Sequence, residues 1–260
     1  MLRVQNGDMD SLVITEHTGW VQLTLNRPEA KNALNTATLA ALAQALAQAT
    51  QNPAIRAALI CGAGGNFAAG ADIAEIEGKT SSEAATDPRK AHWAAIRAFP
   101  KPLIAAVDGF ALGGGLELAL MADLLVLGQS ARLGLPETNL GLIPGAGGTQ
   151  RLMAQIGRLR ASRLILTGEI IDAATAFAWG LGSHLAAADA LSDAIPLAEK
   201  LALRAPLALT AAKTALVAGD ESARAFALER AAFESLFDTA DKAEGLRAFR
   251  DKRKPQFKGK

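Results

Sequence analysis

Cysteine, histidine and aromatic residues are scarce in this sequence. Its 260 residues include one cysteine, three histidines and no tyrosine. A single cysteine, Cys61, excludes a disulfide within the chain, and its place at the end of an apolar run predicts a small buried side chain. Because no disulfide indicates an oxidising compartment, we expect a cytoplasmic protein.

Long apolar runs and an excess of charge of one sign are also missing. Glycine, proline or a charged residue interrupts each apolar stretch well before the roughly 20 residues that a membrane helix needs. The N-terminus has no apolar core of a signal peptide. The formal net charge is +1, which gives no electrostatic reason to expect nucleic acid or an anionic membrane as a partner.

Several common catalytic signatures are absent. The histidines, His17, His92 and His184, lie far apart without a ligand partner three or four residues on, so no metal site is predicted. Neither the Gly-x-Ser-x-Gly nucleophile elbow nor a Walker A sequence occurs. The run at 62–67 imitates a dinucleotide fingerprint, but Phe67 replaces the third glycine that close helix–strand packing requires.

The hydrophobic pattern that remains predicts an α/β fold. Val21, Leu23 and Leu25 alternate with polar residues, which is typical of a strand. Asn35 or Thr36 can cap a helix whose leucines recur every three or four residues. Strands are expected at 12–15, 20–25, 55–61, 103–107 and 124–127, and helices after 35, around 93–96 and at 113–121. This alternation favours an α/β architecture.

Two segments depart from the alternation. From about Asp189 onward the pattern becomes mostly helical, with alanine-, leucine- and arginine-rich periods. We therefore predict a core at 1–195 and a helical region at 196–260 that serves packing or assembly. The segment 78–88 is rich in serine, threonine and acidic residues, which predicts a loop and makes it the best candidate for a mobile one.

Three glycines, Gly113 to Gly115, connect a predicted strand to a predicted helix. Glycine lets a ligand approach the backbone without a Cβ in the way. The first N–H groups of a helix have no internal acceptor and favour negative charge, which suits a developing oxyanion. A close helix–helix crossing that needs small residues explains the glycines equally well.

Two glutamates near these glycines are candidate acid–base groups. Glu117 lies in an apolar stretch, where a carboxylate is costly unless it is paired or has a function. Glu137 follows Pro136, which disfavours helical geometry at Leu135 and predicts a turn or strand end. A structural salt bridge or a solvent-facing position for Glu117, and an ordinary loop position for Glu137, are the simpler interpretations. Spacing alone does not bring the two together.

Taken together, a series of motifs resembles the enoyl-CoA hydratase (crotonase) family over nearly the whole length. The motifs occupy 25–28, 68–73, 113–117, 136–137, 143–151 and 252–259. The resemblance implies a spiral of repeated ββα units with a helical C-terminal region, assembled as homotrimers or as hexamers made of two trimers. The runs at 133–137 and 206–209 also resemble bacterial hydratases of phenylacetate degradation, which act on dehydroadipyl-CoA.

The same resemblance implies roles for individual residues. The backbone amides of Ala71 and Gly114 match an oxyanion hole, and Glu117 and Glu137 match the two catalytic carboxylates. Retaining both acids favours a hydratase, which reversibly adds water to a trans-2-enoyl-CoA and yields a 3-hydroxyacyl-CoA. Isomerisation of 3-enoyl-CoA to 2-enoyl-CoA is the alternative, and a non-catalytic RNA-binding or scaffold protein is a third possibility.

Coenzyme A would enter as part of the acyl-CoA substrate, so no separate cofactor is expected. Arg27, Lys31 and the basic tail with Lys258 could meet its phosphates. By resemblance the tail would serve a neighbouring subunit, with Phe257 near the adenine, although a solvated basic terminus is an alternative. Asp72 is expected to cap or orient its loop. The remaining candidates for substrate contact are Ala69, Gly70, Ile73 and Gly113.

We assign Glu117 as the base because a helix N-terminus favours its anion. Glu137 would be the acid, since the leucines around it would raise its pKa if it is buried. Two positions depart from the family pattern: Asp108 stands where asparagine is common, and Leu116 stands where small or aromatic residues often occur. Leu116 could alter the acyl pocket, so the preferred chain length stays open.

Overall fold

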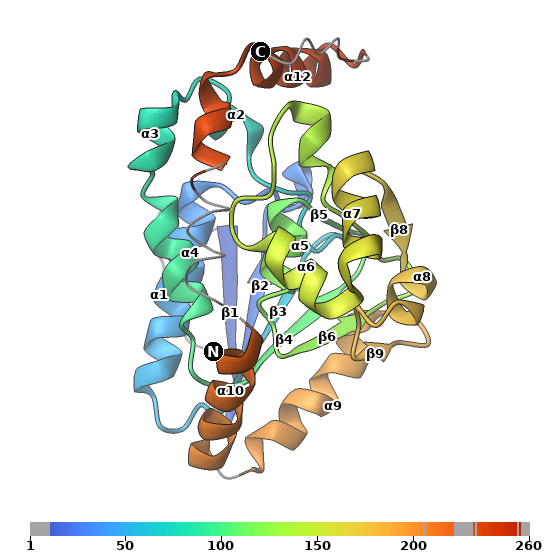
Figure 1. Cartoon of the computed structure of the whole chain (residues 1–260). Helices are drawn as coiled ribbons and strands as arrows, with labels where there is room; N and C mark the ends of the chain where they lie inside the picture. The colour runs from blue at the N-terminus through green and yellow to red at the C-terminus, as the bar shows by residue number, and fades with distance from the viewer. Residues whose placement is uncertain (1–10, 205, 221–230, 232, 254, 256–260) are drawn as a thin grey trace.

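The computed structural model describes residues 11–204, 206–220, 231, 233–253 and 255. A six-stranded sheet of order β1-β2-β3-β4-β6-β9 lies at its centre (Figure 1). β1 and β2 pair antiparallel, and the later neighbours pair parallel. The strands are β1 (Leu12–His17), β2 (Trp20–Leu25), β3 (Ala57–Gly62), β4 (Leu103–Val107), β6 (Leu124–Leu127) and β9 (His184–Leu185).

Helices cover both faces of this sheet. They are α1 (Thr36–Gln51) and α4 (Arg89–Arg97) on one face, and α9 (Ala190–Ala202) on the other. Successive residues of β3 point to opposite faces. Ala58 and Ile60 join the core formed with α1 and α4, whereas Leu59 and Cys61 join the core under α9. This confirms the predicted burial of Cys61 and explains why β3 is apolar at both parities.

A second, three-stranded sheet has the order β5-β7-β8. Its strands and the helices around it are β5 (Phe110–Leu112), β7 (Arg132–Gly134), β8 (Ile170–Asp172), α5 (Gly114–Ala119), the 3-10 turn η3 (Pro136–Leu140), α6 (Gly148–Ile156), α7 (Arg158–Thr167) and α8 (Ala173–Ala178). Each strand has only three residues, too few for a two-residue period to be recognised, so the sequence pattern does not predict this sheet.

The C-terminal region is mainly helical, as predicted. After α9 it comprises α10 (Pro206–Asp220), η4 (Leu236–Asp238) and α12 (Ala240–Arg250). Three short helices lie earlier in the chain, η2 (Pro28–Ala30) after β2, and α2 (Ile73–Ile76) and α3 (Ser81–Ala85) after β3. Because α9 crosses residue 195, where the predicted division falls, the division into two regions stays a prediction. In the described parts of the chain no helix is both long and apolar enough to span a membrane.

Helix caps explain why some of the predicted helix boundaries are correct and others are wrong. Asn35 caps α1, accepting a hydrogen bond from the Thr38 N–H at 2.8 Å, as expected. The segment 78–88 is not simply a loop, because Thr80 and Glu83 form a capping box that starts α3. The helix expected at 113–121 is shorter, since Gly113 has φ 50° and ψ −127° and lies outside α5.

Lys101 fastens the end of α1 to the start of β3. Its Nζ donates to the carbonyl oxygens of Ala49, Asn52 and Ile55 at 2.6, 2.8 and 2.7 Å. One ammonium group therefore satisfies three carbonyls where a helix ends, which are groups that a helix cannot satisfy itself.

We predict that Lys101→Met lowers the free energy of unfolding by about 2 kcal/mol, because three carbonyl oxygens lose a charged donor. Urea denaturation followed by far-UV circular dichroism measures the change. Lys200→Met, at an exposed position on α9, is the control and should stay within about 0.5 kcal/mol of the parent. Equal effects of the two substitutions would contradict the anchoring role.

Candidate functional site

The segment after β3 and the segment leading into α5 lie against each other. Ala68 N–H donates to Phe110 O at 2.8 Å, and Leu112 N–H donates to Ala68 O at 3.0 Å. A Cβ at position 115 would overlap the carbonyl of Ala68, so only Gly115 permits this approach. The glycines therefore serve a close backbone contact, although it joins a loop to a helix rather than two helices.

Two backbone N–H groups meet at the end of this contact. A Cβ built on Gly114 would lie 3.6 Å from the nitrogen of Ala71. Both residues are half-buried. Among the described residues neither N–H donates a hydrogen bond. Two neighbouring donors of this kind can stabilise negative charge on a single bound oxygen.

Pairing with Leu34 holds Ala71 in place. Leu34 N–H donates to Gly70 O at 2.8 Å, and Asp72 N–H donates to Leu34 O at 3.1 Å. In a parallel bridge one residue bonds to the neighbours on either side of its partner, so the N–H of that partner points the other way. The Ala71 donor is therefore directed away from Leu34.

Asn32 supports the same loop and was not identified from the sequence. Its buried side chain donates through Nδ2 to Asn66 O at 2.6 Å and to Ala63 O at 2.8 Å, and its Oδ1 accepts from Arg27 N–H at 2.8 Å. Its φ of 56° is one that asparagine tolerates better than most residues. Only its position beside Lys31, four residues after the first motif at 25–28, could have indicated a role.

Glu117 lies in the first turn of α5 and is 4% exposed. Its Oε1 accepts from Ala146 N–H at 2.7 Å and from Gly148 N–H at 2.9 Å. Two such bonds favour the ionised carboxylate. Burial excludes the solvent-facing interpretation. Because a backbone N–H has no sequence signature, the two donors could not have been predicted, although they fall in the glycine-rich motif at 143–151.

Glu137 is the second residue of η3, which begins two residues after the end of β7. Gly113 N–H donates to Gly134 O at 2.9 Å, which ties the end of β7 to the start of α5. A Cβ on Gly113 would lie 3.2 Å from Oε1 of Glu137, and Oε2 of Glu137 is shielded from solvent. The structure thus brings Glu137, Gly113, Gly114 and Ala71 together, with Glu117 one turn into the same helix.

The C-terminal region covers the loops that carry these groups. A Cβ on Gly145 would lie 2.6 Å from the ring of Phe233, and one on Gly141 would lie 2.6 Å from the backbone of Asp241. Ala71 itself packs against an apolar cluster that includes Phe237. Residues far apart in the sequence therefore enclose one region.

Arg27 and Asp72 bind each other. Arg27 Nη1 donates to Asp72 Oδ2 at 3.0 Å and to Ala33 O at 2.7 Å. Oδ1 of Asp72 accepts from Ala74 N–H and caps α2, which confirms the expected capping role.

The other candidates for substrate contact have different surroundings. Lys31 is exposed, with Nζ 5.0 Å from the centre of the Phe110 ring. Ala69 N–H donates to Lys31 O at 3.0 Å, and Ile73 packs beside Ala71. Phe257 and Lys258 lie outside the described residues, so their contacts with coenzyme A stay predictions, as do those of Arg27 and Lys31.

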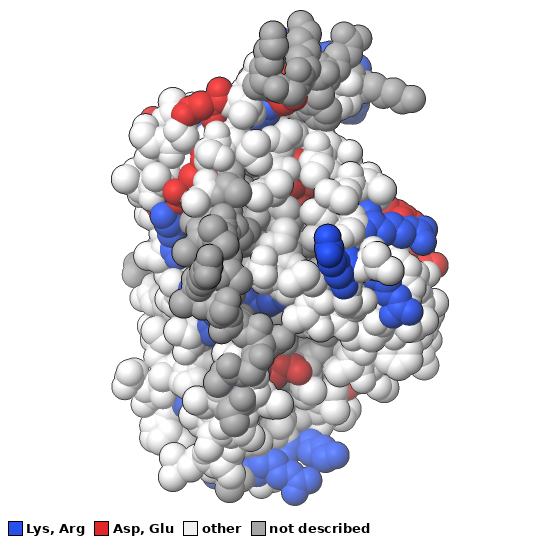
Figure 2. Space-filling view, viewed as in Figure 1, with Lys and Arg blue, Asp and Glu red and all other residues white. Residues whose placement is uncertain are grey.

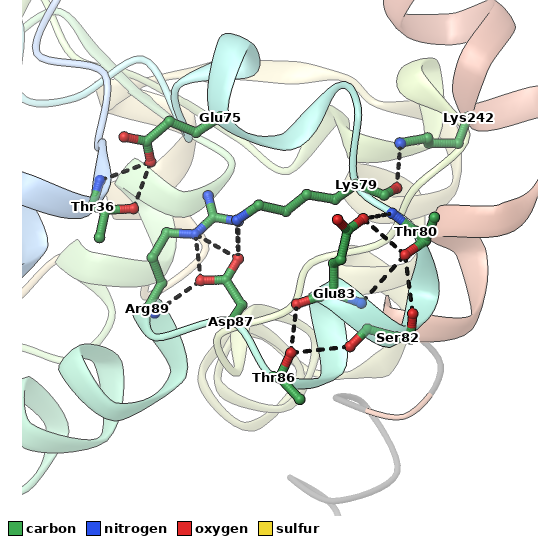
Figure 3. A network of polar contacts seen from close by, with 10 residues as sticks. All are labelled: Thr36, Glu75, Lys79, Thr80, Ser82, Glu83, Thr86, Asp87, Arg89 and Lys242. Carbon is green, nitrogen blue, oxygen red and sulfur yellow. Dashed lines mark hydrogen bonds and ion pairs between the residues drawn. The ribbon is translucent and has the colours of Figure 1, made fainter.

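A polar network fixes the segment that follows Ala71 (Figure 3). Asp87 accepts hydrogen bonds from Arg89 Nη2 at 2.5 Å and Lys79 Nζ at 2.6 Å. Lys242 of α12 donates to the carbonyls of Glu77 and Lys79 at 2.7 and 2.9 Å. Burial alone would raise the pKa of Asp87, but the bonds from Arg89 and Lys79 hold that pKa well below its ordinary value.

No set of three histidine, cysteine or acidic side chains in the described residues is arranged to hold a metal ion.

Comparison with known proteins supports the assignment of this chain to a single protein family. A model of the family described as enoyl-CoA hydratase/isomerase matches residues 15–260. The 2,3-dehydroadipyl-CoA hydratase of Escherichia coli is 46% identical over 97% of this chain and 100% of that protein. A probable enoyl-CoA hydratase of Mycobacterium bovis is 43% identical over 90% and 93%. The crystal structure of a carnitinyl-CoA hydratase from Mycobacterium avium superposes with a TM-score of 0.86, at 36% identity, covering 96% of this chain and 99% of that one.

We predict that Asp87→Asn lowers the free energy of unfolding at pH 7 by about 3 kcal/mol, since it breaks a buried ion pair. The depressed pKa of Asp87 contributes stability that is present above the unfolded-state pKa of about 3.9 and is lost as pH falls through the folded-state value. The difference between parent and variant should therefore shrink below about pH 4. Guanidinium denaturation across pH measures it. Asp251→Asn, at an exposed position, is the control, and a pH-independent difference for Asp87→Asn would contradict the assignment.

Proposed function

Because the chain belongs to the enoyl-CoA hydratase/isomerase family and is an enoyl-CoA hydratase, we propose that Glu117 and Glu137 are its catalytic pair. They act on a thioester whose carbonyl oxygen is bound by the N–H groups of Ala71 and Gly114. The reaction is the reversible addition of water to a trans-2-enoyl-CoA. The observation that carries the proposal is the proximity of two unengaged donors, within the described residues, to two shielded carboxyl groups.

The first requirement of the reaction is polarisation of the thioester carbonyl. Charge grows on the carbonyl oxygen as C3 accepts a nucleophile, and the donors of Ala71 and Gly114 stabilise that charge. One such donor contributes about 3 kcal/mol in comparable sites. Since the donors are backbone groups held by Leu34 and Gly115, they need little reorganisation during the reaction.

The second requirement is transfer of two protons. Glu117 acts as the base, because two backbone N–H groups stabilise its carboxylate. It removes a proton from water as the water oxygen bonds to C3. Glu137 acts as the acid and donates a proton to C2, since shielding from solvent favours a neutral carboxyl group. Proton exchange with solvent then restores both groups.

Substrate contacts extend the proposal to the remaining residues. The backbone at Ala69, Gly70 and Gly113 and the side chain of Ile73 would border the thioester, with Asp72 orienting the loop. Arg27, Lys31 and the tail residues Phe257 and Lys258 would contact coenzyme A. Because coenzyme A is part of the substrate, the enzyme would need no separate cofactor. A hydratase of this kind would act in the cytoplasm.

The acyl group is the next element of the proposal. The relative from Escherichia coli is named for 2,3-dehydroadipyl-CoA and is 46% identical over its full length. We therefore take a short enoyl chain that ends in a second carboxylate, as formed in phenylacetate degradation, as the candidate substrate.

Glu117→Gln and Glu137→Gln should each lower kcat for hydration of crotonyl-CoA by about 10²- to 10⁴-fold, because an amide cannot transfer the proton. Glutamine keeps an oxygen that can accept the bonds from Ala146 and Gly148, so folding should be preserved. The loss of absorbance of the conjugated thioester measures turnover, and isothermal titration measures retained binding of crotonyl-CoA.

Glu169→Gln is the matched control, because Glu169 lies between α7 and β8 and its side chain forms an ion pair with the exposed Arg163 of α7. Near-parental turnover by either active-site variant would remove that residue from the mechanism. A parent protein that isomerises a 3-enoyl-CoA but does not hydrate crotonyl-CoA would replace hydration by isomerisation.

We also propose that the chain assembles as a trimer or as two paired trimers. Large apolar side chains stand exposed on two helices, including Leu159 of α7 at 86% and Leu207 of α10 at 85%. Figure 2 shows a group of basic side chains in the region of α7. An arginine-rich apolar surface is typical of protein interfaces.

Sedimentation equilibrium should give a particle mass three or six times the 26.9 kDa of the chain. Leu159→Asp and Leu207→Asp should each shift the distribution toward smaller species, because a charge at a buried interface costs several kcal/mol. Leu203→Asp places the same charge at another exposed leucine, and its size distribution is measured for comparison. A monomeric parent protein would refute the assembly.

A further inference from the structure

Lys242 of α12 is a buried lysine that contacts two segments of the site. The residue is 3% exposed. Its Nζ donates to Glu77 O at 2.7 Å and to Lys79 O at 2.9 Å, the second of which Figure 3 shows, and lies 4.9 Å from the centre of the Phe237 ring. Its backbone nitrogen would lie 2.6 Å from a Cβ on Gly141, at the end of η3. The side chain therefore meets the end of α2, and the backbone meets the end of η3.

The carbonyls bound by Lys242 belong to the segment that carries the Ala71 donor. Glu77 is the C-cap of α2, and its N–H donates to Ile73 O at 3.0 Å. α2 is a single helical turn, about 6 Å long, that begins two residues after Ala71. Ala71 and Ile73 pack against the apolar cluster that contains Phe237. Because the hydrogen-bonded turn is rigid and short, a displacement of its end is transmitted to Ala71.

α12 also packs on the segment that carries Glu137. A Cβ on Gly245 would lie 2.5 Å from the backbone of Leu140, the last residue of η3. Leu142 N–H donates to Glu137 O at 3.1 Å, and Leu142 belongs to the same apolar cluster. α12 is thus seated on η3, while Lys242 reaches from it to α2.

Other polar links between the C-terminal region and the segment 77–90 are more exposed. They are Arg250 with Glu77, Lys90 with Glu234, and Ser81 with Asp238. Exposed ion pairs contribute little to stability, because water and side-chain entropy offset the attraction. Lys242 is the buried cation among these links.

Carboxylates of the chain itself stabilise the charge of Lys242. Burial lowers the pKa of Lys242, and the nearby charges of Asp238, Glu77 and Glu83 oppose that change. The ammonium group therefore needs no anion from outside the chain. Its hydrogen bonds to two carbonyls at the end of a helix indicate a role in holding that helix in place.

From these contacts we propose that Lys242 positions the Ala71 donor relative to Glu137. This inference rests on the proposed function, in which Ala71 and Gly114 bind the thioester oxygen and Glu137 donates a proton to C2. The carbon that carries this oxygen is bonded to C2, so one bound thioester meets the donors and the acid only at one separation of α2 and η3. Lys242 maintains this separation by linking α12 to both segments, and it acts through them rather than on the reacting atoms.

Removal of the ammonium group should misalign the Ala71 donor without removing it. The pairing of Leu34 with the residues on either side of Ala71 remains, so the N–H stays near the site. Loss of a whole donor lowers kcat by about 10²- to 10³-fold, and we expect a loss of about tenfold from misalignment. kcat should fall more than KM changes, since the donors bind most strongly the charge that grows in the transition state.

Three variants test this role. Lys242→Met keeps an unbranched side chain and removes the donor. Lys242→Gln is shorter and keeps a neutral donor, and it serves as the second variant if Lys242→Met does not fold. Lys101→Met is the matched control, because it also removes a lysine bound to backbone carbonyls, but one that precedes β4, whereas the site follows that strand.

Two measurements are made on variants shown to be folded by circular dichroism. The first gives kcat and KM for hydration of crotonyl-CoA. The second is the infrared carbonyl stretch of bound butyryl-CoA, a saturated thioester that cannot be hydrated, labelled isotopically at the thioester carbonyl. Hydrogen bonds to the thioester oxygen lower this frequency. Lys242→Met should lower kcat about tenfold, Lys242→Gln should lower it less, and both should reduce the infrared shift on binding. Lys101→Met should retain the parental kcat and the parental shift.

Equal kcat values and equal infrared shifts in the Lys242 variants and Lys101→Met would overturn the positioning role. A lower kcat with a parental infrared shift would also overturn it, because the donor would then be correctly placed without Lys242. Unfolding of both Lys242 variants where Lys101→Met stays folded would assign Lys242 to stability alone. A parent enzyme that binds butyryl-CoA without an infrared shift would overturn the proposed oxyanion donors, and this inference with them.

Discussion

The close approach of two backbone segments, one after β3 and one leading into α5, is the constraint on which the site depends. Gly115 permits it, because a side chain there would overlap the carbonyl of Ala68. The approach brings the N–H groups of Ala71 and Gly114 together, while Gly113 leaves room for the carboxyl group of Glu137. One steric condition therefore positions the two donors and the carboxyl group of Glu137 at the same time.

Rigid support for these groups comes from hydrogen bonds outside the two segments. Leu34 and Asn32 fix the loop that carries Ala71, and the N–H groups of Ala146 and Gly148 fix Glu117. The sheets supply the frame on which these loops are mounted, an arrangement typical of functional loops. Preorganised donors of this kind are effective because they need not reorient as charge develops.

Elements with a clear period or cap could be predicted from the sequence, and the elements that depend on tertiary contacts could not. The alternation at Val21, Leu23 and Leu25 gave β2, and Asn35 gave the start of α1. Thr80 and Glu83 were taken for loop residues, because the same polar side chains favour loops and helix caps. The backbone N–H groups that donate to Glu117 could not be predicted, since any residue except proline offers an N–H. The pairing of Glu117 and Glu137 with one glycine-rich turn was expected only from a family resemblance.

The contacts between the C-terminal region and the glutamate loops have a consequence for biosynthesis. Gly141 packs on Asp241, Gly145 packs on Phe233, and Lys242 joins α12 to the segment after α2. A nascent chain can pair β1 to β4 before residues 233–242 are synthesised, but these enclosing contacts require those residues. The central sheet can therefore form before the contacts that enclose the glutamate loops.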